Sequence, residues 1–258
     1  MKKEIRIFFT ALMFYTRIPC PKWVDHSEEY LNKSSRYFPL IGILVGSISA
    51  LVFWMAHLLL SPAVSVILAI LSGVLVTGAF HEDGLADVCD GFGGGWTKEK
   101  ILLIMKDSRI GAYGAIGLIL LFSLKFSLLV TVPAYQVPFL LISAHSISRF
   151  TAISFIFTHA YAREDETSKT KPVAKRPPLY NFVIAAFFGL APLLLFCTPW
   201  VFLLLIPLVL LKIYLGWYFK KWIGGYTGDC LGATQQIAEV LFYLTFVILI
   251  QCPLWKFI

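Results

Sequence analysis

Seven long apolar stretches decide what this chain can fold into. A helix that crosses a membrane needs about 20 mostly apolar residues. Stretches of this kind occur at 38–60, 62–80, 111–132, 137–157, 179–198, 199–219 and 234–252. Only 14% of the 258 residues are charged, whereas a soluble domain of this size carries about 25%. The sequence therefore predicts an all-α, polytopic membrane helix bundle of about seven spans, forming one domain over residues 1–258.

The segment before the first span, residues 1–37, begins with MKKEIRIFFTALMFYTRIPC. Its basic start resembles a signal peptide, but Arg6 and Arg17 interrupt the apolar part and no small-residue cleavage site follows. We expect instead a short interfacial or re-entrant helix whose basic residues lie at the lipid headgroups.

Lysine and arginine gather in particular segments. They occur before the first span and in the loops 81–110, 158–178 and 220–233, whereas the joints near 61, 134 and 198 carry no charge. Because positive loops stay in the cytoplasm, we expect the N-terminus inside the cell membrane, the C-terminus outside, and any active site facing the cytoplasm. The five cysteines lack the spacing of a zinc site or a disulfide framework.

The stretch HEDGLADVCDGFGGG, residues 81–95, follows the second apolar run directly. If that helix continues past residue 80, Asp83, Asp87 and Asp90 fall at i, i+4 and i+7 on one face. Like charges so placed repel one another, and Mg²⁺ is a cation that prefers such oxygen ligands. Glu82, about a quarter turn away, is a further candidate ligand or base. The alternative is a solvated acidic helix end.

Two familiar motifs are absent from this stretch. HEDGL has Leu85 where the zinc motif HExxH needs its second histidine. GFGGG is not followed by the Lys-Ser/Thr pair of a P-loop, although its glycines leave backbone amides open to phosphate.

Basic side chains next to the acidic stretch are candidate phosphate ligands. Lys106 and Arg109 can oppose a diphosphate, or they serve only as positive-inside anchors, and Asp107 between them can join a metal shell or act as a base. Gly111, Gly114 and Gly117 share a helix face that favours tight helix packing.

Lys125, His145 and Arg149 are ionisable residues inside the third and fourth predicted spans. Ionisable groups at membrane depth are costly and are usually paired or functional. We favour Arg149, with His145 one turn before it, as a contact for substrate or for the acidic cluster, and assign no role to Lys125.

GGYTGDCLGATQQ, residues 224–236, opens the last span. Small residues at a helix N-terminus form an anion-binding position, here around Gly228. Asp229 can hold the cation there or cap the helix. The basic stretch TSKTKPVAKRPP, residues 167–178, is suited to anionic lipid headgroups.

Five stretches in this order carry a family resemblance: FFTALMFYTRIPCP, RYFPLIGILVG, GAFHEDGLADVCDGFGGG, KDSRIGAYGAIGL and GGYTGDCLGATQQ. Over nearly its whole length the chain resembles the cobalamin synthase family, the adenosylcobinamide-GDP ribazoletransferases. The resemblance implies an Mg²⁺-dependent transferase that joins adenosylcobinamide-GDP to α-ribazole, or its 5′-phosphate, and releases GMP in the last assembly step of coenzyme B12. The ribose 3′-hydroxyl would attack the cobinamide-side phosphorus.

The resemblance also implies roles and partners. Asp83, Asp87, Asp90 and Glu82 would hold the metal, and Asp83, Glu82 or Asp107 would be the base. Substrate contacts would come from Lys106, Arg109, His145, Arg149, Gly228 and Asp229. Besides the two substrates, expected partners are membrane lipids and other enzymes of B12 nucleotide-loop assembly, and no nucleic acid.

Two rival functions have sequence arguments against them. A CDP-alcohol phospholipid synthase carries an arginine after the alanine of its signature, whereas here Ala86 is followed by Asp87. A transporter is expected to carry polar residues at mid-membrane on broken helices, and this sequence suggests that they gather at one face instead.

Overall fold

A computed structural model describes residues 2–24, 27–162 and 177–251. Within these ranges the regular structure is helical, apart from an isolated bridge between Tyr161 and Tyr226. The longer helices are α1 (Lys2–Tyr15), α3 (Phe38–His57), α4 (Pro62–Thr77), α5 (Phe80–Gly94), α7 (Ala112–Thr131), α8 (Val137–Thr158), α9 (Leu179–Leu190), α10 (Leu205–Ile223) and α11 (Gly228–Gln251). The short ones are α2 (Glu28–Ser34), α6 (Lys98–Ile104), η1 (Ser35–Tyr37), η3 (Ala191–Phe196) and η4 (Pro199–Leu204).

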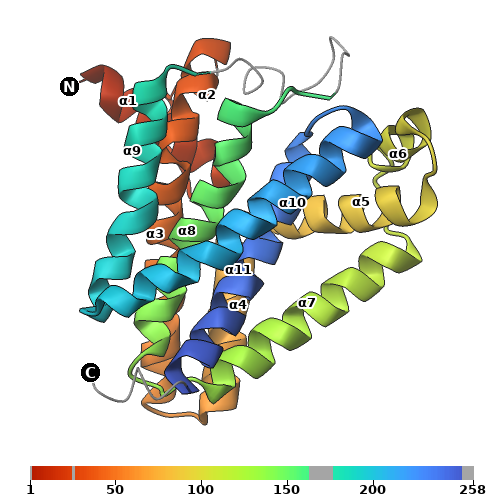
Figure 1. Cartoon of the computed structure of the whole chain (residues 1–258). Helices are drawn as coiled ribbons and strands as arrows, with labels where there is room; N and C mark the ends of the chain where they lie inside the picture. The colour runs from red at the N-terminus through yellow and green to blue at the C-terminus, as the bar shows by residue number, and fades with distance from the viewer. Residues whose placement is uncertain (1, 25–26, 163–176, 252–258) are drawn as a thin grey trace.

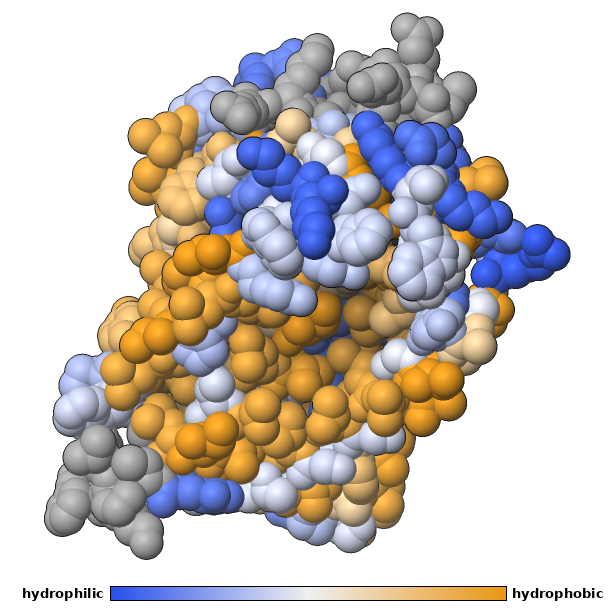
Figure 2. All heavy atoms as spheres, turned by 45° about the vertical axis from the view of Figure 1, so that its right-hand side comes forward, coloured by the Kyte–Doolittle hydropathy of each residue, from blue (hydrophilic) through white to orange (hydrophobic). Residues whose placement is uncertain are grey.

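The predicted membrane helix bundle is confirmed. Six helical stretches of the described chain are long and apolar enough to cross a membrane, and up to seven if the bent pair α4 and α5 is taken as one span. Figure 2 shows a broad hydrophobic band across the middle of one face and hydrophilic side chains gathered above it. In Figure 1 the start of α1 lies at one end of the bundle. The end of α11 and the joint between α7 and α8 lie at the other.

The predicted span limits agree with the helices to within a few residues, with one exception. The last helix begins at Gly228 rather than at 234, because the Thr227 hydroxyl accepts a hydrogen bond from the amide of Cys230 at 3.2 Å and so caps the helix earlier. Residues 167–176 of the basic stretch lie outside the described residues.

The second span does not continue as one straight helix past residue 80. Gly78 and Ala79 both adopt left-handed backbone conformations, with φ of 67° and 56°. The amide of Ala79 donates to the carbonyl of Val74 at 3.0 Å, which is the bond pattern of a Schellman helix end. As a result α5 leaves α4 at an angle of 89° and runs across the bundle (Figure 1).

The N-terminal helix α1 packs on the bundle and is not among the candidate spans. Its inner face buries Ile7 and Ala11, while the Glu4 carboxylate pairs with the guanidinium of Arg36, which is 3% exposed. This arrangement brings the end of α1 against the start of α3 through stacked rings of Tyr15 and Phe38, 4.2 Å apart. The interfacial or re-entrant position of α1 stays a prediction.

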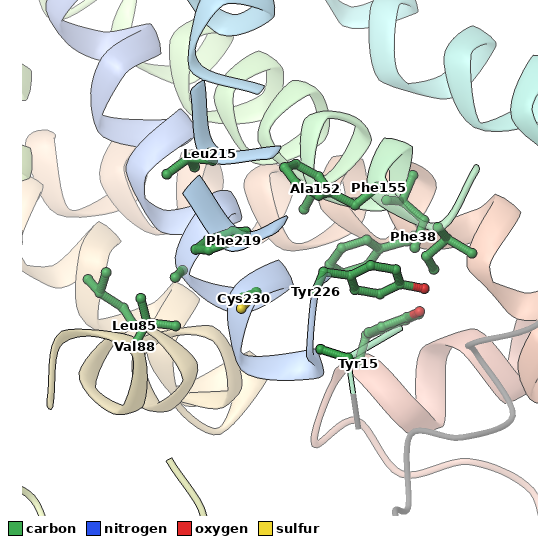
Figure 3. Packing of buried hydrophobic residues seen from close by; sticks show 14 of the residues in the cluster. Tyr15, Phe38, Leu85, Val88, Ala152, Phe155, Leu215, Phe219, Tyr226 and Cys230 are labelled. Atoms are coloured by element: carbon green, nitrogen blue, oxygen red, sulfur yellow. The ribbon is translucent and has the colours of Figure 1, made fainter. Parts of the chain in front are cut away.

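The buried apolar side chains form two clusters along the bundle. One surrounds Phe38, Leu85, Phe155, Phe219 and Cys230 near the end that holds α1 and α5. Figure 3 shows Leu85 and Val88 of α5 on one side of this cluster and the rings of Tyr15, Phe38 and Tyr226 on the other. The second cluster lies towards the opposite end, around Phe53, Leu140 and Phe242.

We expect Gly78→Ala to lower the melting temperature of the purified protein. A non-glycine residue in the left-handed region costs about 1–2 kcal/mol, and a Cβ here would lie 2.4 Å from Nε of Arg17. Thermal unfolding in detergent measures the change. Adding Arg17→Ala removes the clash but not the backbone strain, so the double variant should recover only part of the loss. The control Ala79→Gly, in the same turn, should not lower the melting temperature. Equal stability of Gly78→Ala and wild type would contradict this account.

Candidate active site

The exposed face of α5 carries the acidic residues, as their spacing predicted. Asp83 is exposed, and Asp87 and Asp90 are partly exposed, while His81, Gly84 and Leu85 are buried on the opposite side. The carboxylates therefore share one side of a helix that lies across the bundle.

Asp90 is committed to a structural contact. Its Oδ2 accepts a hydrogen bond from the amide of Gly111 at 2.7 Å and its Oδ1 from the amide of Gly114 at 2.9 Å. These amides belong to the start of α7, where helical donors have no partner within the helix. Asp90 thus caps α7 and ties it to α5. The predicted close packing of the α7 glycine face is confirmed: a Cβ on Gly117 would lie 2.8 Å from Sγ of Cys89.

The predicted metal cluster of Asp83, Asp87, Asp90 and Glu82 is not assembled. Among the described residues, no group of three or more His, Cys, Asp or Glu side chains is placed to hold a metal ion. The physical reasons are that Asp90 binds two amides and that Glu82 points into the bundle, with 6% exposure. Mg²⁺, however, is usually held by one or two carboxylates together with substrate phosphates and water. Asp83 and Asp87 fit that requirement.

The predicted phosphate ligands Lys106 and Arg109 lie on the exposed segment between α6 and α7. Asp107 on the same segment accepts hydrogen bonds from the Arg109 guanidinium, among them Nε to Oδ1 at 3.1 Å and Nη2 to Oδ2 at 2.7 Å. The Arg109 guanidinium lowers the pKa of Asp107 to about 2. A carboxylate with so low a pKa is a weak proton acceptor near neutral pH, so Asp107 is poorly suited to be the base.

The start of α11 packs directly on α5. A Cβ on Gly84 would lie 3.0 Å from the carbonyl oxygen of Asp229 and 3.3 Å from Cα of Gly232, so a larger residue would push the two helices apart by a few tenths of an ångström. Asp229 is not the cap of α11, since Thr227 takes that role; its Oδ2 accepts from the Thr227 hydroxyl at 3.4 Å. The contact brings the stretches 78–95 and 224–236 together, as the predicted site requires.

A buried polar layer lies between the two apolar clusters. Lys125 of α7 and Glu239 of α11 form an ion pair at 2.8 Å, with side chains only 5% and 3% exposed. Lys125 also donates to Oε1 of Gln236 at 2.7 Å, and Gln236 donates to Oε1 of Glu82 at 3.0 Å. The network therefore joins α7 and α11 to the inner side of α5.

Helix α8 completes this layer. Nδ1 of His145 lies 3.8 Å from Oε2 of Glu239, and Gln235 donates to Glu239 at 2.8 Å and to Ser148 at 3.0 Å. Arg149 is 1% exposed and donates to the carbonyl of His145 at 2.8 Å. His145 and Arg149 thus lie inside the bundle and not on the exposed face of α5 that carries Asp83 and Asp87; their contact with substrate or with the acidic cluster stays a prediction.

Sequence reasoning missed the α11 half of the layer, Gln235, Gln236, Glu239 and Tyr243. The signal was present, because four polar residues recur at helical spacing within an otherwise apolar span. The layer also places polar side chains inside the bundle, so the expectation that they gather at one face only is wrong.

Comparison with known proteins decides the family. The sequence model of the family described as Cobalamin-5-phosphate synthase matches residues 7–247. The chain belongs to this family. A Shewanella frigidimarina protein named adenosylcobinamide-GDP ribazoletransferase is 52% identical over 246 residues, 94% of each chain. Its namesake in Shewanella oneidensis is 49% identical over 252 residues, 96% of this chain and 95% of its own. No solved structure gives a significant match.

The five stretches that carry the family resemblance meet around α5. The stretch 78–95 forms α5 itself, and 106–118 is bound to it through Asp90. The stretch 224–236 contacts α5 at Gly84. The first two stretches, 8–21 and 36–46, contribute Tyr15 and Phe38, and the Phe38 ring stacks on that of His81 at 5.5 Å. This convergence, rather than a preformed metal cluster, marks the candidate active site.

We expect Lys125→Met to destabilise the protein strongly, because it leaves the Glu239 carboxylate buried without its cation. Removing one partner of a buried ion pair typically costs about 3–5 kcal/mol, whereas replacing both is often nearly neutral. Thermal unfolding in detergent should therefore show a large loss for Lys125→Met and a partial recovery for Lys125→Met with Glu239→Gln. Additive losses in the double variant would show that the two side chains do not depend on each other.

Proposed function

We propose that this chain is the membrane transferase that joins adenosylcobinamide-GDP to α-ribazole, or to α-ribazole 5′-phosphate, and releases GMP. The observation that carries the proposal is the convergence of all five family stretches on α5, whose exposed face presents Asp83 and Asp87. The names of the relatives, at about half identity over nearly the whole chain, support the same substrates.

The reaction forms a bond between the ribose 3′-oxygen and the cobinamide-side phosphorus and breaks the bond from that phosphorus to the bridging oxygen, which leaves with GMP. Asp83 and Asp87 would hold Mg²⁺, which when bound neutralises negative charge on the diphosphate. Of the three candidate bases, Asp83 is the one on the accessible face, since Glu82 is buried and Asp107 is paired. It would take the proton from the attacking hydroxyl. Lys106 and Arg109 add positive charge beside this face.

The site would face the cytoplasm of the cell membrane, with lipids around the apolar band. This orientation rests on the excess of lysine and arginine in the N-terminal segment and in the loops around α5. Arg36, which is held by Glu4 and Asn181, and the exposed Lys106 lie on such segments. Contacts with other enzymes of nucleotide-loop assembly would form on the same side.

We expect Asp83→Asn and Asp87→Asn each to lower GMP release on the order of 100-fold or more, because each removes a charged oxygen ligand and Asp83→Asn also removes the base. Activity is measured in proteoliposomes with both substrates over a Mg²⁺ titration, and Asp87→Asn should also raise the Mg²⁺ concentration at half-maximal rate. The matched control is Glu99→Gln, an exposed acid on α6, which should be unaffected. Normal turnover in both aspartate variants would exclude this metal site.

A cysteine-labelling experiment tests the orientation. Cys197 is exposed in the turn between η3 and η4, at a joint expected outside the cell. In a variant that keeps only this cysteine, a membrane-impermeant maleimide should label spheroplasts without permeabilisation. With Glu99→Cys in a chain that lacks the native cysteines, labelling should require permeabilisation. The opposite pattern would place α5 outside.

A further inference from the structure

An aromatic pocket lies where α5 and α11 begin. Its walls include Tyr15 of α1, Phe38 of α3, His81 of α5 and Tyr226, with Phe80 at the rim, and its cavity volume is about 40 Å³. Tyr15, Phe38 and His81 form a column of stacked rings, with centroids 4.2 Å and 5.5 Å apart along it. Four of the five family stretches contribute to these walls, including Gly228 and Gly232 of α11.

Two residues that line this pocket each have a buried polar atom without a hydrogen-bond partner. These atoms are Nε2 of His81 and the hydroxyl of Tyr226, on side chains that are 1% and 2% exposed. Burying an unpaired polar group is costly, and such exceptions call for an explanation. Burial also raises the pKa of the Tyr226 hydroxyl above its ordinary value, so this group stays protonated and able to donate. Stacked rings around two unused polar atoms are the features of a site for a flat heterocycle.

We propose that this pocket binds the base of the nucleoside substrate, a flat benzimidazole with one ring nitrogen free to accept a hydrogen bond. The inference rests on the proposed function and adds to it the position of the acceptor substrate. Tyr226 donates to the ring nitrogen, and His81 is available to a ribose hydroxyl.

Guanine, the other flat base in the reaction, suits the pocket less well. Its edge carries several donors and acceptors, and each would lose a water partner on entering a pocket whose lining has two unpaired polar side-chain atoms. The benzimidazole of ribazole is apolar apart from its ring nitrogen. The chemistry of the walls therefore favours the nucleoside over the leaving nucleotide.

The position of the pocket suits an attack by the ribose. Phe80, Asp83 and Asp87 are spaced i, i+3 and i+7, so the rim and the two carboxylates share the exposed side of α5. A base held against His81 leaves its ribose near Phe80, one turn from Asp83. The hydroxyl nucleophile is then placed beside the carboxylate proposed to accept its proton.

The pocket has to widen for the base to enter. A cavity of about 150 Å³ holds a benzene ring, and this one is smaller. Phe80 is 44% exposed and meets Phe14 edge-on at 5.7 Å, so its ring has open space beside it into which it can turn. Phe80 therefore acts as the movable wall of the pocket.

The test measures binding of α-ribazole to purified, detergent-solubilised protein by the fluorescence of its base, without the corrinoid substrate, so no turnover is needed. We expect Tyr226→Phe to weaken binding about 10-fold, the size of one lost neutral hydrogen bond, and Phe80→Leu to weaken it through lost stacking. The melting temperature of Tyr226→Phe should not fall, since the variant removes an unpaired hydroxyl. Tyr218→Phe, a tyrosine outside the pocket, is the matched control.

Activity assays separate this proposal from the proposed function. In both pocket variants the KM for α-ribazole should rise while the KM for adenosylcobinamide-GDP stays constant. Unchanged α-ribazole binding in folded Tyr226→Phe and Phe80→Leu, or weakened binding of GMP instead, would overturn the base pocket. Failure of the wild type to release GMP while it still binds α-ribazole would overturn the proposed reaction and leave the pocket standing.

Discussion

The ion pair between Lys125 and Glu239 is the interaction on which the rest of the bundle depends. Each charge lies in a helix that crosses the membrane and is almost completely buried. A charge buried at this depth without its partner would strongly destabilise the fold. Glu239 uses both carboxylate oxygens, since Oε1 accepts from Lys125 and from Tyr243 and Oε2 from Gln235. The hydrogen-bond donors come from α7 and α11, and His145 of α8 lies beside the same carboxylate. The contacts of Glu239 therefore fix the relative positions of three helices.

The same layer sets the position of α5. Gln236 accepts a hydrogen bond from the Lys125 ammonium on Oε1 and donates one from Nε2 to Glu82, so the first turn of α5 is bound to the centre of the bundle. With Glu82 held inwards, the helix turn places Asp83 outwards. On the other side Asp90 holds the start of α7. Of the four acids in the stretch 81–95, Glu82 and Asp90 therefore build the scaffold, and Asp83 and Asp87 are the two that we propose to hold the metal.

The sequence predicted most of the fold and part of the site, for identifiable reasons. Spans follow from local hydropathy, and the shared face of the aspartates follows from helical spacing. The break at Gly78 was missed because the second left-handed residue is Ala79, a type that rarely adopts that conformation. The pairing of Lys125 with Gln236 joins positions 111 residues apart, which no local pattern in a single sequence reveals. Asp90 looked like a metal ligand because a helix-capping carboxylate and a ligating one have the same spacing.

Phe38 connects the polar layer to the aromatic pocket. The Arg149 guanidinium lies over the Phe38 ring, 5.6 Å from its centroid. The same ring stacks with the rings of Tyr15 and His81. Arg149 is in turn bound to His145, beside Glu239. A cation over an aromatic face stabilises both partners when water is excluded. Arg149 therefore holds Phe38, a wall of the pocket, and links it to the charged side chains that position the helices. In the proposed site, entry of the base moves only the ring of Phe80. The distance between His81 and Asp83 stays the same, because both residues belong to α5.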